Sequence, residues 1–126
     1  MIRTNLLLKL ALATTLFSST ALAAAGDTTS LKVYDEEDTD SGRAGEIYAE
    51  LSMSNSASVG KATLKLWNRS GTPQVAYKVT VRVICSGQGA AQNFTGTLSS
   101  GGSSNTLTTR CKSGSVGEAT AFITRV

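Results

Sequence analysis

The chain contains 126 residues, with 12 Lys and Arg, 9 Asp and Glu, and no histidine. Without histidine it lacks the parts for Ser-His or Cys-His nucleophilic pairs and for histidine-ligated zinc or copper. The sequence also contains no phosphate-binding P-loop and no dinucleotide fingerprint. Its bases are spread over predicted strands with few aromatic residues, which does not favour nucleic-acid binding. We therefore expect a protein that is not an enzyme, with no cofactor and no nucleic-acid partner, and we assign no metal ligands.

Residues 1–23 are typical of a secretory signal peptide. Arg3 and Lys9 supply a positive start, an apolar run follows, and small residues precede two candidate cleavage points, after Ala23 or after Ala25. The apolar run is shorter than the about 20 residues that a transmembrane helix needs. We therefore expect export to the periplasm or the medium, with no stable membrane span.

Removal of the signal peptide changes the charge balance. Cleavage discards two bases and no acid, which leaves 10 Lys and Arg against 9 Asp and Glu. Residues 24–50 then carry a net charge of −6, whereas residues 51–126 carry a net charge of +7. The mature chain is nearly neutral overall but strongly polarised along its length.

Residues 24–126 predict a single domain with one disulfide. A domain of about 100 residues buries little more than about 60% of its unfolded surface, so a covalent cross-link adds useful stability. The only cysteines are Cys85 and Cys111, and such a pair in an oxidising compartment favours a disulfide. Closing a loop of this length restricts the unfolded chain by roughly 3.5 kcal/mol.

The strand pattern predicts an all-β fold. Strict alternation of apolar and polar residues indicates strands over residues 46–54, 62–68 and 75–85. The turn signal NRSGTP between the last two predicts that they form a hairpin. Weaker strand patterns cover residues 31–34, 93–98, 106–111 and 118–125. About seven short strands with frequent turns predict a small antiparallel β-sandwich of immunoglobulin-like architecture.

The phase of the predicted hairpin places basic and aromatic side chains on one outer face. When the leucines of residues 62–68 point inward, the residues between them point outward. An exposed tryptophan among bases is typical of a binding hot spot. A bulge at the strand end is the alternative, because it would turn Trp67 into the core. The candidate binding face comprises Tyr48, Lys65, Trp67, Lys78 and Arg82.

Residues 35–42 (DEEDTDSG) form an acidic N-terminal segment. Its carboxylates belong to Asp35, Glu36, Glu37, Asp38 and Asp40. Their spacing does not match an EF-hand loop that begins at Glu37 or at Asp38, although a looser, weak calcium site is one interpretation. The others are a solvated connection between the first two strands and a segment that docks on a basic surface.

Two functional hypotheses follow from these patterns. The first is an exported, non-enzymatic binding module that recognises another protein or an acidic glycan through the candidate binding face. The alternative is a self-associating structural or surface component, assembled by acidic-to-basic pairing or by edge-strand pairing. Residues 93–109 (NFTGTLSSGGSSNTLTT) carry none of the charges that normally block the extension of a sheet.

Overall fold

The computed structural model describes residues 26–56, 58–69, 71–101 and 104–126. Within these ranges the secondary structure consists of eight strands: β2 (Thr28–Val33), β3 (Thr39–Ala44), β4 (Ile47–Ser54), β5 (Lys61–Asn68), β6 (Val75–Cys85), β7 (Gln88–Leu98), β8 (Ser104–Arg110) and β9 (Val116–Arg125). The predicted signal peptide, residues 1–23, and both candidate cleavage points lie outside the described residues.

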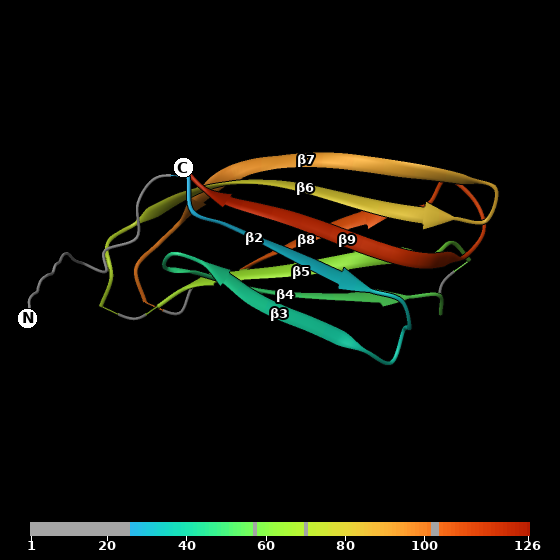
Figure 1. Ribbon diagram of the computed structural model, residues 1–126, viewed down its shortest axis with the longest axis horizontal. Coiled ribbons are helices and arrows are strands. Elements are labelled where there is room, and N and C mark those ends of the chain that lie inside the picture. The colour runs from blue at the N-terminus through green and yellow to red at the C-terminus, as the bar shows by residue number, and fades with distance from the viewer. Residues whose placement is uncertain (1–25, 57, 70, 102–103) are drawn as a thin grey trace, which may run out of the picture.

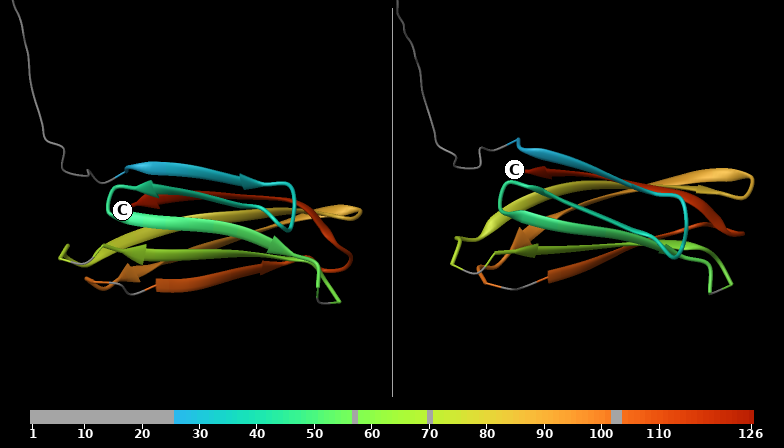
Figure 2. Two further views of the ribbon diagram at one scale, coloured as in Figure 1. Left: turned by 90° about the horizontal axis from the view of Figure 1, so that it is seen from below. Right: turned by 60° about the horizontal axis from the view of Figure 1, so that its bottom comes forward.

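The strands form two antiparallel sheets of four strands that face each other (Figures 1 and 2). One sheet has the strand order β2-β9-β6-β7 and the other β3-β4-β5-β8. After the β3-β4-β5 meander the chain crosses to the opposite sheet to form the β6-β7 hairpin, then returns to place β8 beside β5. The predicted antiparallel β-sandwich with a disulfide is confirmed, with eight strands in the described chain in place of about seven.

The core lies between the sheets and is made by residues with a period of two. In β4, β5 and β6 every second side chain is buried, among them Leu51, Leu64 and Val81. Successive side chains of a strand point to opposite faces, so the same alternation sends the polar residues outward. The inner faces fix which residues form the two outer surfaces.

The predicted hairpin between residues 62–68 and 75–85 is wrong. β5 pairs with β4 and β8, whereas β6 pairs with β7 and β9 in the opposite sheet. The connection between β5 and β6 is held by the fully buried Asn68, which donates hydrogen bonds to the carbonyl oxygens of Pro73 and Ser99 and accepts one from the Thr72 hydroxyl. Because β5 and β6 each have one apolar face, they bury those faces across the core instead of pairing edge to edge.

Strand β3 is absent from the predicted strand set. It begins inside the predicted acidic segment, so residues 39–42 are strand and not connection. Its inner face packs closely on β2: a Cβ atom added to Gly42 would lie 2.8 Å from Thr29 Oγ1 and 3.1 Å from Leu31 Cδ2. The small residue at this position therefore allows β3 and β2 to lie side by side at one margin of the sandwich.

Two further contacts join the sheets. The disulfide between Cys85, at the end of β6, and Cys111, just after β8, has a Cα–Cα distance of 5.8 Å. Tyr77 of β6 is buried, and its hydroxyl accepts a hydrogen bond of 2.9 Å from the Asn105 side chain of β8. The sandwich is thus cross-linked covalently at one end and by a polar contact between β6 and β8.

The opposite end of the sandwich carries a partly buried ion pair. Arg125 Nε, in the last residue of β9, donates a hydrogen bond of 2.6 Å to Glu46 Oε1, in the turn before β4. Burial acts to raise the pKa of the Glu46 carboxyl, but the hydrogen bond and charge of Arg125, together with a backbone hydrogen bond, outweigh burial and lower that pKa below its ordinary value. The pair ties the meander sheet to the last strand of the other sheet.

Candidate binding face

The outer face of the β3-β4-β5-β8 sheet carries a row of basic and aromatic side chains. Strand register places Arg43 of β3 opposite Tyr48 of β4, and Tyr48 opposite Trp67 of β5. The Tyr48 and Trp67 rings are stacked, with centroids 6.0 Å apart and planes 16° apart. Both side chains are half-buried, so part of each ring meets solvent. The row forms an aromatic surface with a cation at its β3 end.

Two guanidinium groups flank the Tyr48 ring. Arg43 Nη1 donates a hydrogen bond of 3.2 Å to Tyr48 Oη, and its Cζ lies 5.8 Å from the ring centroid. Arg69, in the connection after β5, places its Cζ 5.6 Å from the same centroid. These distances are typical of cation–π contacts. Lys65 lies in the next row, opposite Glu50. We call this group the basic–aromatic platform: Arg43, Tyr48, Lys65, Trp67 and Arg69.

An open hollow of about 460 Å³ lies over the platform. Its lining includes Ser41, Arg43, Tyr48, Glu50 and Trp67. The solvent-exposed parts of the two rings offer apolar contact area, and guanidinium groups bind carboxylates with two N–H donors. Arg43 attracts an acidic group of a ligand, whereas Glu50 repels one and can accept hydrogen bonds from hydroxyl groups. The hollow therefore suits a ligand that is acidic at one side and has C–H or hydroxyl groups at the other.

The structure divides the predicted binding face between the two sheets. Tyr48, Lys65 and Trp67 lie together on the platform. Lys78 and Arg82 lie on β6, and their exposed side chains belong to the outer face of the β2-β9-β6-β7 sheet. The shared surface expected for all five residues is therefore wrong. It depended on the β5-β6 hairpin, which the fold does not contain.

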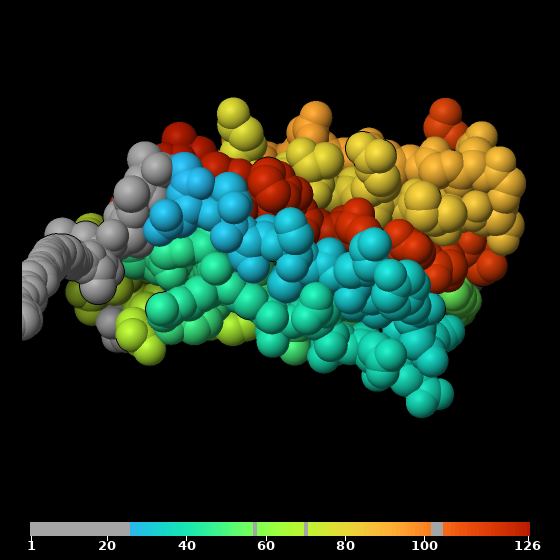
Figure 3. Space-filling view, viewed as in Figure 1, coloured from blue at the N-terminus to red at the C-terminus, as the bar shows by residue number. Residues whose placement is uncertain are grey.

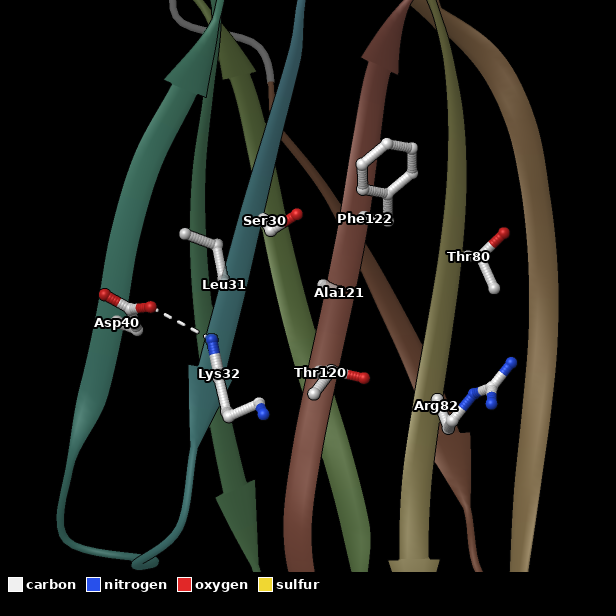
Figure 4. A pocket seen from close by; sticks show the side chains of 9 residues that line it. All are labelled: Ser30, Leu31, Lys32, Asp40, Thr80, Arg82, Thr120, Ala121 and Phe122. Atoms are coloured by element: carbon white, nitrogen blue, oxygen red, sulfur yellow. Dashed lines mark hydrogen bonds between the residues drawn. The ribbon is translucent and has the colours of Figure 1, made fainter.

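The second outer face has a hollow of its own, around Phe122. This side chain of β9 is 49% exposed. Figure 4 shows Phe122 and Thr120 on β9, with Arg82 on β6 and Lys32 on β2 at either side. The volume of this hollow is about 400 Å³. It offers one aromatic ring and two cations, without the stacked ring pair that distinguishes the platform.

Sequence reasoning missed Arg43, Arg69 and Phe122 as members of these faces. Arg43 reaches the platform only through β3, which lacks a strand pattern. Arg69 lies beyond the alternating part of β5, so its direction depends on the connection. The alternation of residues 118–125 could have identified Phe122, because its neighbours Ala121 and Ile123 are the buried ones.

The acidic residues form an exposed connection and one hydrogen bond to another strand. Asp35, Glu36, Glu37 and Asp38 lie between β2 and β3, where the chain projects at the end away from the described termini (Figures 1 and 3). Asp35 Oδ1 accepts a local hydrogen bond of 3.2 Å from the Glu37 N–H, whereas Asp40 Oδ2 accepts one of 2.9 Å from the Lys32 backbone N–H, on another strand. Among the described residues, no group of three or more His, Cys, Asp or Glu side chains is arranged to hold a metal ion.

Comparisons with protein-family models, with curated proteins and with solved structures found no match to this chain. In the part of the chain that the structure describes, no helix has the length and hydropathy needed to cross a membrane. The platform must be interpreted from its own geometry.

Proposed function

We propose that this chain is an exported, non-enzymatic binding module that recognises an acidic glycan through the basic–aromatic platform. The observation that supports the proposal is the stacked Tyr48–Trp67 pair with a guanidinium group 5.6 to 5.8 Å from the tyrosine ring at two positions. Export is supported by the signal-like residues 1–23 and by the disulfide, since structural disulfides are typical of oxidising compartments.

The platform favours a glycan because its two kinds of group match the two kinds of surface on a uronate ring. The C–H face of a sugar ring can lie on the aromatic surface, while Arg43 and Arg69 bind its carboxylate. Except for Arg69, the platform residues lie on paired strands, so the backbone that carries them needs little ordering on binding. An acidic protein segment is the competing ligand, which offers carboxylates but fewer rigid ring faces.

Trp67 is the only tryptophan of the chain, so its fluorescence reports directly on the platform. We expect oligogalacturonate to change the emission in a saturable manner, and neutral dextran to leave it unchanged. Because the contacts include exposed cations, the affinity should fall as salt rises. Trp67→Ala should weaken binding, measured by calorimetry, by about 30-fold or more, the range of a hot-spot aromatic residue.

A matched pair of charge reversals locates the site. Arg69→Glu changes the platform, and Arg82→Glu makes the same change on the opposite outer face, at a side chain that is also exposed. Only Arg69→Glu should weaken binding of oligogalacturonate. Equal effects of the two variants would show that binding follows net charge and would contradict the proposal. Binding of poly-glutamate without binding of oligogalacturonate would contradict the glycan proposal and show that the platform recognises an acidic protein segment.

A further inference from the structure

The two margins of the sandwich differ in how their edge strands are protected. β2 and β3 form one margin, and there the inward-turned Asp40 carboxylate occupies the Lys32 backbone N–H on the free edge of β2 (Figure 4). Four exposed acidic residues occupy positions 35–38, in the connection between β2 and β3. Charged residues at an edge, above all inward-pointing ones, prevent the addition of another strand. This margin is closed to sheet extension.

β7, the longest strand of the other margin, lacks this protection by charged residues. β7 is the last strand of its sheet and spans 11 residues, Gln88–Leu98, without a single charged side chain. Its outward-facing residues are small or polar and exposed: Gly89, Ala91, Asn93, Thr95 and Thr97. A long, uncharged edge strand presents unpaired backbone groups to any strand that can pair with it.

Apolar side chains at this margin are only partly covered. Phe94 of β7 and Leu107 of β8 pack against the core but are partly exposed. A strand added beyond β7 would shield the Phe94 ring as well as satisfy backbone groups. The margin therefore has both the polar and the apolar features of an interface.

We infer that β7 pairs with β7 of a second copy of this chain, in antiparallel register about a two-fold axis near Asn93. In this register Ala91 faces Thr95 of the partner copy, and Gly89 faces Thr97. No bulky or like-charged pair arises, so the edge is its own complement, as a two-fold interface requires. A second copy of this chain meets this condition with the β7 sequence alone, so we assign it as the partner of this edge.

The charges near the edge are compatible with this pairing. Within this sheet, the cations nearest to β7 are Lys78 and Arg82, which lie one strand inward on β6. Three strand spacings would separate them from β6 of the partner, a distance of about 14 Å. This exceeds the Debye length of about 8 Å at physiological salt, so their repulsion is largely screened. Dimerisation should strengthen slightly or stay constant as salt rises, whereas glycan binding should weaken.

Sedimentation equilibrium over a range of protein concentrations tests the inference. We expect a concentration-dependent dimer of the full mature chain, of the weak class that a single added strand pair supports. Asn93→Lys places two like charges at the centre of the pair and should weaken dimerisation about tenfold or more. Thr28→Lys is the matched control, since it adds the same charge at an exposed position of β2, the other edge of the sheet.

Amide hydrogen exchange gives a second measurement that needs no variant. Protection in β7 should rise with protein concentration, while protection in β2 should not. A chain that stays monomeric at every concentration overturns the inference, as does a dimer that Asn93→Lys leaves intact or that Thr28→Lys weakens equally. Trp67→Ala should leave the dimer unchanged and Asn93→Lys should leave glycan affinity per chain unchanged, so that either proposal can fail without the other.

Discussion

At Gly60 the absence of a side chain lets three segments meet. Its N–H donates a hydrogen bond of 2.9 Å to the Gly114 carbonyl, and its carbonyl accepts one of 2.9 Å from the Cys111 N–H. Beside it the Asn55 amide pairs with both backbone groups of Val116, at 2.7 and 3.0 Å. A Cβ atom on Gly60 would overlap Asn55 Oδ1 and Val116 N. The position is therefore restricted by packing.

We expect Gly60→Ala to lower the free energy of unfolding by about 2 kcal/mol or more, because the added methyl group overpacks the site and displaces the Asn55 hydrogen bonds. Gly117→Ala is the matched control, since the nearest atom to its added Cβ is a carbonyl oxygen at 4.0 Å. Urea denaturation of the two variants measures the difference. A Gly60→Ala chain as stable as the control would contradict this interpretation of the contact.

At the same scale, the platform was only partly predictable. The alternation of β5 predicts the outward direction of Lys65 and Trp67, because each lies between buried residues. Arg43 and Arg69 could not be placed in this way. One belongs to a strand without apolar periodicity, and the other to a connection whose path depends on the buried Asn68. The cations nearest the tyrosine ring are therefore a product of the tertiary structure.

At the scale of elements, periodicity predicted strands but not partners. Strict alternation predicted β4 and β6 because both are buried on one face only. An apolar face does not specify the strand that will cover it, so the β5-β6 hairpin was an incorrect choice between two arrangements that bury the same residues. β3 was missed because its sequence, TDSGRA, has one apolar residue, and its position comes from pairing with β4 and from the fit of Gly42 against β2.

The ion pair between the β4 turn and the end of β9 predicts a pH dependence of stability. The Glu46 pKa is lowered in the folded chain from an ordinary value of 4.5. Its contribution is therefore complete above pH 4.5 and is lost as the pH falls through the folded-state pKa. Glu46→Gln should be less stable than wild type at pH 7, and the difference should shrink below about pH 4.5.

Thermal unfolding between pH 7 and pH 3 measures that difference. Glu118→Gln is a useful control, because Glu118 pairs with Lys32 at the longer distance of 3.8 Å and is more exposed. Its effect on the unfolding temperature should be small at every pH. A constant gap between wild type and Glu46→Gln across the range would show that the carboxylate charge does not stabilise the fold.

At the scale of the whole molecule, the disulfide limits how far the sheets separate on unfolding. Cys85 and Cys111 are 26 positions apart in the chain. In the chain-entropy treatment, a loop of this length stabilises the folded state by roughly 3.5 kcal/mol. We expect the Cys85→Ser, Cys111→Ser double variant to lose about that free energy of unfolding in urea. A loss close to zero would mean that the unfolded chain is already compact near these residues.

The first and last described residues lie together at one end of the sandwich. The Gly26 N–H donates a hydrogen bond of 2.6 Å to the Arg125 carbonyl, and β2 and β9 run antiparallel from there. A force applied to these two points would load the β2-β9 ladder one hydrogen bond at a time, from the end inward. Ladders opened in this way yield at low force, unlike ladders that are sheared as a whole. A chain anchored on both sides of this domain would therefore lengthen first by releasing β2, while the disulfide and the platform stayed intact.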